Sequence, residues 1–332
     1  ISVIQGQRAG IFMKQIRISQ INGFQIAHAQ TEAAATGCTA ILCKQGACAG
    51  VDVRGGGPAS PETELLRPVS TAEEIHCVML SGGSAFGLAA GDGAMAYLEE
   101  QGVGFDVGIG RVPLVCGASL FDLEIGAYDI RPDKTMGYAA CQDAERNDPA
   151  EGNVGVGTGA TVGKLYNMDG FMKSGLGIYA AQVGPVQVGV VIAVNALGDI
   201  VDYDTKEILA GLLNQEKTGF ADTVKTFYEE IEDTRSLWNG NTTIGCVITN
   251  ARLTKAQCNK LASIGHNGYA QTIRPVHTTA DGDTLFVMAS GEVEVNVDAL
   301  GALVTECVGR AINRAALMAR PAYGLPAACS FR

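Results

Sequence analysis

The chain has 332 residues, of which 47% are hydrophobic and 18% charged, so it can bury a large core as one domain or two. Its net charge of -11 excludes nucleic acid and anionic membrane as expected partners, because phosphate contacts need clustered Lys and Arg. The longest apolar run, residues 183–194, contains Gly, Pro and Gln and is too short to cross a bilayer. The chain also begins without a charged-then-apolar signal sequence.

The cysteines and histidines show no metal-binding pattern. Ten cysteines are scattered among apolar and small residues, with neither a CxxC pair nor a His-Cys ligand spacing. We therefore expect buried free thiols in a reducing cytoplasm, rather than a disulfide framework. No metal and no cofactor is predicted, and the four histidines predict no histidine-dependent mechanism.

The first half of the chain alternates short strands with glycine-rich turns. We expect strands at 23–29, 39–43 and 73–80, a strand and turn over 104–110 and 113–115, helices at 61–66 and 88–101, and a surface loop at 142–152. A glycine-rich turn at 50–57 carries Asp52 and Arg54, which we interpret as a buried ion pair that pins a loop.

Two glycine-rich segments resemble known motifs but fail at required positions. Residues 82–86 lack the final glycine of the G-x-S-x-G nucleophile elbow, so Ser84 is not predicted to be a nucleophile. The amides that open the following helix can still face an anion or a developing oxyanion. Residues 155–164 fail the phosphate-loop pattern, because Thr158 replaces a glycine and Leu165 follows Lys164.

The second half predicts longer elements. Strands at 175–183 and 187–195 form a hairpin around Gly184-Pro185, and residues 202–238 are polar and helix-prone, as in an exposed linker. A strand buried on both faces follows at 242–249, then a helix at 254–270, a strand at 285–289 and a helix at 297–320.

The turn before that buried strand is a candidate processing site. Asn239, Gly240 and Asn241 lead directly into Thr242 at the mouth of the strand. If the preceding peptide bond were cut, Thr242 would carry both a hydroxyl nucleophile and a free α-amine. The amine has an intrinsic pKa near ~8 and can act as the general base without histidine. In isolation, the same residues also fit an ordinary turn and strand.

With four other segments, Asn241-Thr242 resembles the DmpA-type family of self-processing L-aminopeptidase/D-esterases, β-peptidyl aminopeptidases and nylon-oligomer hydrolases. The segments, in chain order, are 36–39 (TGCT), 50–56 (GVDVRGG), 80–88 (LSGGSAFGL) and 155–160 (GVGTGA). The resemblance implies an α+β, four-layer αββα sandwich like that of DmpA and ornithine acetyltransferase. It also implies one catalytic domain, cut between Asn241 and Thr242 into an α chain (1–241) and a β chain (242–332), and a homo-oligomer of such pairs.

The resemblance also implies roles for four further residues. Asn195, at a predicted strand end, would donate its amide to the tetrahedral oxyanion. Lys164 would lower the pKa of the amine or stabilise negative charge. Asp281 and Asp283 match the paired acidic positions of nylon-oligomer hydrolases and, as alternate residues, can reach one site. The local alternatives are a turn-capping asparagine, a solvated lysine and a surface Asp-Gly-Asp turn.

One position departs from the family pattern. Phe121 falls where many relatives have a pocket tyrosine, which puts the substrate in doubt more than the reaction. We expect a hydrolase of small peptides, amino-acid amides or ω-amino amides that acts through an acyl-enzyme on Thr242. An acyltransferase of the ornithine acetyltransferase type and an uncut, non-enzymatic binding protein remain as alternatives.

Overall fold

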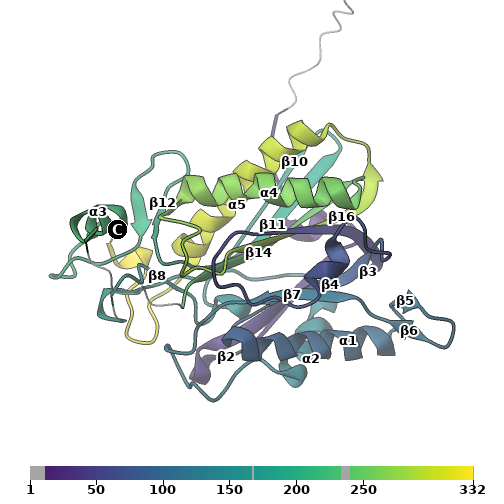
Figure 1. The fold of residues 1–332 in the computed structure, drawn as a ribbon, viewed down its shortest axis with the longest axis horizontal. Coiled ribbons are helices and arrows are strands. Elements are labelled where there is room, and N and C mark those ends of the chain that lie inside the picture. Colours follow the sequence, from purple (N-terminus) through teal and green to yellow (C-terminus); the bar gives the residue numbers. More distant parts are fainter. Residues whose placement is uncertain (1–11, 167, 233–239, 332) are drawn as a thin grey trace, which may run out of the picture.

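Two β-sheets lie face to face between two pairs of helices in a computed structural model, which describes residues 12–166, 168–232 and 240–331 (Figure 1). The predicted four-layer αββα sandwich is confirmed. No helix among these residues is long and apolar enough to cross a membrane.

The first sheet contains the strands that carry the candidate site. Its order is β1-β10-β11-β14-β16-β3, and every neighbouring pair is antiparallel except β14 and β16. The strands are β1 (Lys14–Gln15), β3 (Thr36–Val53), β10 (Leu176–Val183), β11 (Val186–Asn195), β14 (Thr242–Ala251) and β16 (Thr284–Val293). The predicted hairpin of β10 and β11 and the buried strand β14 are confirmed.

The long strand β3 belongs to both sheets. Residues 36–42 pair with β2 (Gln25–Thr31) and β4 (Ile75–Ser81), whereas residues 48–53 pair with β16. β7 (Val115–Ser119) completes the second sheet beside β4. The predicted turn at 50–57 is therefore wrong for residues 50–53. Gly50 instead allows close packing of a helix, because a Cβ there would lie 2.3 Å from the backbone N of Asn259.

Helices cover the outer face of each sheet (Figure 1). The first sheet packs against α4 (Lys255–Thr272) and α5 (Val297–Met318), and the second against α1 (Ala90–Glu100) and α2 (Lys134–Asp143). Side chains of β14 alternate between two cores. Ile244, Cys246 and Ile248 pack between the sheets, and Val247 packs in the core that includes α4 and α5.

Two sequence-based expectations were incomplete. Helix α2 was not predicted, because its buried face consists of Gly137, Ala140 and Cys141 and so lacks a strong apolar stripe. The expected exposed linker at 202–238 is wrong in part, since β13 (Ile208–Ala210) pairs with β12 (Asp199–Val201) and buries the following leucines. The segment also contains α3 (Thr223–Glu229), and its residues 233–238, with Asn239, lie outside the described residues.

The described residues contain further short elements. They are β5 (Phe105–Asp106), β6 (Arg111–Val112), β8 (Thr161–Val162), β9 (Met172–Lys173), β15 (Ile273–Arg274) and eight 3-10 helices, Ile18–Gln20, Glu32–Ala34, Thr63–Leu66, Ser84–Ala89, Ala144–Arg146, Gly155–Gly157, Met168–Gly170 and Ala328–Phe331. All ten cysteines are free, as expected, and eight of them are buried.

Candidate active site

Thr242 and Asn195 face each other at one end of the first sheet. Thr242 begins β14, Asn195 ends β11, and the antiparallel register makes their Cα atoms partners. Both side chains are buried within a sheet that is covered on both faces. The register therefore holds the candidate nucleophile and the candidate oxyanion donor on adjacent strands.

The peptide group before Thr242 makes two contacts at its carbonyl oxygen. The Thr242 hydroxyl donates to the carbonyl oxygen of Asn241, and the main-chain N–H of Gly282 donates to the same oxygen at 2.9 Å. Gly282 lies so close that a Cβ on it would be 2.8 Å from Oγ1 of Thr242. A side chain at position 282 would therefore displace the hydroxyl or the loop.

Lys164 connects Asn195 to the residue before Asn241. Its Nζ donates to Oδ1 of Asn195 at 2.7 Å and to the carbonyl oxygen of Gly240 at 2.7 Å. Lys164 is 1% exposed, so the alternative of a solvated lysine is wrong. Burial lowers the pKa of Lys164 to about 8, although Glu124 and two buried aspartates oppose the shift.

The side-chain amide of Asn195 is fully engaged in the uncut chain. Its Oδ1 also accepts from the main-chain N of Thr161 at 3.0 Å. Its Nδ2 donates to the carbonyl oxygen of Phe121 at 2.9 Å and to that of Gly240 at 3.3 Å. Because ammonium and amide donors surround Oδ1, the orientation of the Asn195 side chain is determined by its neighbours, with Nδ2 towards Gly240.

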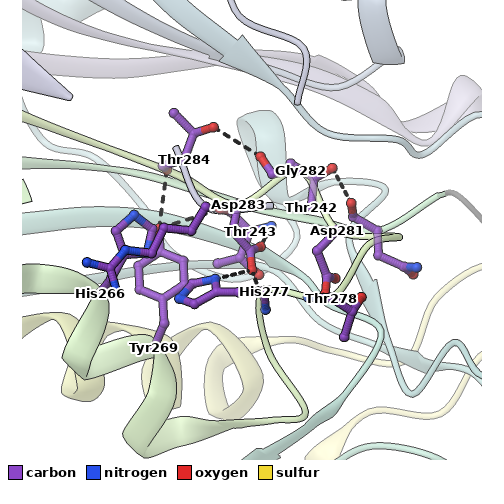
Figure 2. A network of polar contacts seen from close by, with 12 residues as sticks. Thr242, Thr243, His266, Tyr269, His277, Thr278, Asp281, Gly282, Asp283 and Thr284 are labelled. Atoms are coloured by element: carbon purple, nitrogen blue, oxygen red, sulfur yellow. Dashed lines mark hydrogen bonds and ion pairs between the residues drawn. The ribbon is translucent and has the colours of Figure 1, made fainter. Parts of the chain in front are cut away.

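Asp281 and Asp283 are buried side by side but bind different partners (Figure 2). Asp283 accepts from the main-chain N of Thr243 at 2.8 Å, and Asp281 accepts from the main-chain N and the hydroxyl of Thr278 at 2.8 and 2.6 Å. Burial, with the neighbouring Asp283, raises the pKa of Asp281 to about 6. The alternative of a surface Asp-Gly-Asp turn is wrong.

The residues that follow β3 bind the backbone of the acidic loop, which comprises residues 275–283 between β15 and β16. The N–H groups of Arg54 and Gly57 donate to the carbonyl oxygens of Asp283 and Asp281 at 2.9 and 2.8 Å. A Cβ on Gly55 would lie 2.3 Å from the Asp281 carbonyl oxygen. The Asp52–Arg54 ion pair is present at 3.0 Å. It is partly exposed rather than buried, because the two side chains are 25% and 36% accessible.

His277 is a site residue that sequence reasoning missed. Its Nδ1 lies 2.8 Å from Oδ2 of Asp283, and its main-chain N donates to the same oxygen at 3.2 Å. His266 and Tyr269 from α4 pack against its ring (Figure 2). The available signal was the spacing of His277 from Asp281 and Asp283 in one loop, which a search for metal ligands does not detect.

Asp122 is a second missed residue, and it contacts three of the segments that carry the family resemblance, 36–39, 80–88 and 155–160. It accepts from the Thr36 hydroxyl and the main-chain N of Gly83, both at 2.7 Å. A Cβ placed on Gly159 would lie 2.6 Å from the Cβ of Asp122. Burial raises the pKa of Asp122 to about 6. Its neighbour Phe121 positions a carbonyl oxygen against Asn195, so this turn braces the site.

A cavity of about 180 Å³ opens onto the Asn241–Thr242 peptide group. Among the residues that the structure describes, Phe121 is the aromatic one in the lining, and the others are small: Gly56, Gly57, Ala59, Ser84, Ser119, Thr279 and Ala280, beside Asn241 and Thr242. Ser84 has a φ of 56°, at the start of the 3-10 helix that precedes α1. The cavity can hold a small group against Thr242 with Phe121 beside it.

The chain is similar to known proteins along most of its length. The model of peptidase family S58 matches residues 17–328. A Mycobacterium tuberculosis protein described as an uncharacterized aminopeptidase is 37% identical, over 93% of this chain and 96% of its own length. A 6-aminohexanoate-oligomer endohydrolase of Kocuria sp. is 30% identical over 89% of this chain and 84% of its own.

Solved structures share the fold. The L-aminopeptidase D-Ala-esterase/amidase of Ochrobactrum anthropi, described as a variant of the Ntn-hydrolase fold, superposes with a TM-score of 0.65 at 15% identity. A β-aminopeptidase of Burkholderia sp. superposes with a TM-score of 0.63 at 18% identity. Each alignment covers 91% of this chain and 86% of the other. The chain thus belongs to peptidase family S58 and is a hydrolase of peptide or other linear amide bonds.

Proposed function

We propose that the chain cuts itself between Asn241 and Thr242, and that the new N-terminal Thr242 then hydrolyses small amides. The observation that carries the proposal is the carbonyl oxygen of Asn241, which accepts both from the Thr242 hydroxyl and from Gly282 N–H at 2.9 Å. A nucleophile and an oxyanion donor thus meet at the one peptide bond that the resemblance marks for cleavage.

Self-cleavage proceeds by an acyl shift from nitrogen to oxygen. Oγ1 of Thr242 bonds to the carbonyl carbon of Asn241 while Gly282 N–H stabilises the oxyanion. The C–N bond then breaks, and the nitrogen of Thr242 takes up the hydroxyl proton. Water hydrolyses the resulting ester, which leaves a carboxylate on Asn241 and a free α-amine beside the hydroxyl of Thr242.

In the cut enzyme, the α-amine of Thr242 is the general base. A substrate carbonyl enters the cavity, Oγ1 attacks it and the amine takes the hydroxyl proton and passes it to the leaving amine. Nδ2 of Asn195, which donates to Gly240 in the uncut chain, stabilises the oxyanion. Water then hydrolyses the acyl-enzyme on Thr242.

The buried charges have separate tasks in this proposal. Lys164 lies against Gly240 and Asn195, where its positive charge lowers the pKa of the new amine. Asp283 binds Thr243 N–H and thereby orients the residue that carries the nucleophile. Asp281, with a pKa near 6, accepts a proton more readily than an ordinary carboxylate, so the pair need not carry two full charges.

Small amides fit the site best. The cavity holds about 180 Å³, and its described lining is mostly glycine, alanine, serine and threonine, with the large side chain of Phe121 beside them. We therefore propose small peptides, amino-acid amides and short ω-amino amides as substrates. Hydrolysis of 6-aminohexanoate oligomers, the activity named for one relative, belongs to this class.

The two products of cleavage stay together in this proposal. Strands β14 and β16 of the β chain lie between β11 and β3 of the α chain in one sheet, so neither chain buries its core alone. We propose one catalytic domain, residues 1–241 with residues 242–332, assembled as a homo-oligomer of such pairs. Ten free thiols support a reducing, cytoplasmic location.

The decisive experiment is the intact mass of the purified protein under denaturing conditions. Two fragments that meet at Asn241 and Thr242 are expected, together with release of amine from an amino-acid amide. A single uncut species that stays inactive after long incubation would overturn the proposal. Faster turnover that requires an added amine acceptor, with transfer of the acyl group to it, would indicate an acyltransferase.

A further inference from the structure

His277 holds Asp283 by two donors on one residue. Its main-chain N and its Nδ1 lie 3.2 and 2.8 Å from Oδ2 of Asp283, while Oδ1 accepts from Thr243 N–H at 2.8 Å. The Asp283 side chain is 1% exposed and that of His277 17%. The carboxylate therefore bridges the loop that bears His277 and the residue next to the proposed nucleophile.

The hydrogen bonds assign the tautomer of His277. Both oxygens of Asp283 accept from main-chain N–H groups, so the carboxylate is bound as an acceptor and Nδ1 of His277 donates to Oδ2. Nε2 is buried and has no hydrogen-bond partner among the described residues. The ring is thus arranged to present one donor to Asp283 through Nδ1.

The surroundings hold the ring in place. His266 and Tyr269 pack with ring centroids 4.8 and 5.7 Å from that of His277. Nε2 of His266 bonds the carbonyl oxygen of Asp52 at 3.0 Å, so His266 is anchored to β3. Burial lowers the pKa of His266 to about 4, and it therefore packs as a neutral ring.

The backbone of His277 is also constrained. Its φ is 57°, a left-handed conformation that is unfavourable for most residues with a side chain. This conformation accompanies the alignment of the main-chain N and Nδ1 on the same carboxylate oxygen.

We propose that His277 is a positioning residue for the hydrolysis proposed above. Its Nδ1–H fixes the orientation of the Asp283 carboxylate, which in turn holds Thr243 N–H and so the placement of Thr242. His277 takes no proton from the substrate. This inference rests on the proposed function of Thr242 and adds to it a donor that acts through Asp283.

Two variants test the donor while respecting the backbone. His277→Gly removes the ring and accepts a positive φ, whereas His277→Asn also tolerates it and returns an amide N–H near the place of Nδ1. We expect kcat of His277→Gly to fall by roughly tenfold to a hundredfold, as expected for a displaced catalytic group, with KM nearly unchanged. His277→Asn should recover most of kcat and keep the pH–rate profile of the wild-type enzyme.

A matched control separates loss of a buried histidine from loss of the donor, and a second comparison serves if His277→Gly does not fold. His76→Gly removes a buried histidine from the start of β4, in the second sheet, and should lower stability but not kcat. If His277→Gly fails to fold, His277→Gln replaces it, because its amide nitrogen lies one bond too far out to replace Nδ1. In that comparison the asparagine variant should be the more active.

The outcomes separate the two proposals. Wild-type kcat in His277→Gly, or no rescue by asparagine in a folded protein, overturns the role of His277 while Thr242 chemistry stands. A shifted pH–rate profile in His277→Asn means that the ring transfers protons, which also overturns it. A wild-type protein that neither cuts itself nor hydrolyses amides overturns the proposed function instead.

Discussion

The main-chain N–H of Gly282 donates a 2.9 Å hydrogen bond to the carbonyl oxygen of Asn241, the residue immediately before Thr242. The contact joins the acidic loop to the mouth of β14, where Asn241 and Asp281 also form a parallel bridge. A carbonyl polarised by a fixed backbone donor is a more reactive acyl group than one exposed to water.

Substitutions of Thr242 separate its hydroxyl from its shape. Thr242→Val keeps the volume of a buried residue but has no nucleophile, so we expect an intact, folded chain without amidase activity. Thr242→Ser keeps the hydroxyl and should still cut, more slowly. Intact mass and amide turnover report both effects. Normal turnover by the valine variant would end the assignment of Thr242 as the nucleophile.

A methyl group at Gly282 should slow self-cleavage. The new Cβ would lie 2.8 Å from Oγ1 of Thr242 and 2.7 Å from the carbonyl oxygen of Gly57, so the hydroxyl or the donor must move. We expect Gly282→Ala to cut itself roughly tenfold to a hundredfold more slowly than the wild-type chain. Mass spectrometry of the uncut chain over time measures the rate.

Gly110→Ala is the matched control for that substitution. Gly110 has open space where a Cβ would stand and no positive φ, so this variant should cut at the wild-type rate. Equal rates for the two alanine variants would mean that the Gly282 contact plays no part in cleavage.

Loss of the charge on Asp283 should impair hydrolysis. Asp283→Asn keeps an oxygen for Thr243 N–H but turns an amide N–H₂ towards the two donors of His277, so both hydrogen bonds from His277 are lost. We expect kcat to fall by roughly tenfold or more, measured on the cut enzyme with an amino-acid amide. Asp106→Asn, in the exposed hairpin of β5 and β6, should leave kcat unchanged. A wild-type rate for Asp283→Asn would restrict this carboxylate to a structural role.

Asp281 should make stability depend on pH in a known direction. Its pKa in the folded protein is about 6, above the ordinary 3.8, so the folded chain holds a proton that the unfolded chain has released. This contribution is fully present below about pH 4 and is lost as the pH rises through 6. The loss amounts to at most about 3 kcal/mol.

Denaturant unfolding of Asp281→Asn, in an uncut Thr242→Val background, measures that contribution. Relative to the variant, the aspartate form should lose free energy of unfolding between pH 4 and pH 7. The uncut background keeps the protein a single chain, so that dissociation does not enter the measurement. Parallel stability curves across this range would contradict the assignment of a raised pKa.

The sequence alone predicted the elements with strong local signals. The buried strand β14 follows from its run of small and β-branched residues, and the hairpin of β10 and β11 from the Gly184-Pro185 turn. Thr242 and the paired acids Asp281 and Asp283 came instead from the family resemblance, because local composition also fitted an ordinary strand and a surface Asp-Gly-Asp turn. Helix α2 was missed, since its small buried residues carry almost no periodic apolar signal.

Only the tertiary structure decided which distant residues meet. The register of β11 against β14 sets Asn195 opposite Thr242, and the path of β3 through both sheets brings Gly55 and Gly57 under the acidic loop. The structure also decided between the two alternatives for Lys164, because its side chain is buried and donates to Asn195 rather than being solvated. Strand register and burial depend on contacts between segments far apart in the chain, which local composition cannot encode. The contacts that Gly282 makes with Asn241 and that Asp283, bound by His277, makes with Thr243 depend on such long-range contacts too.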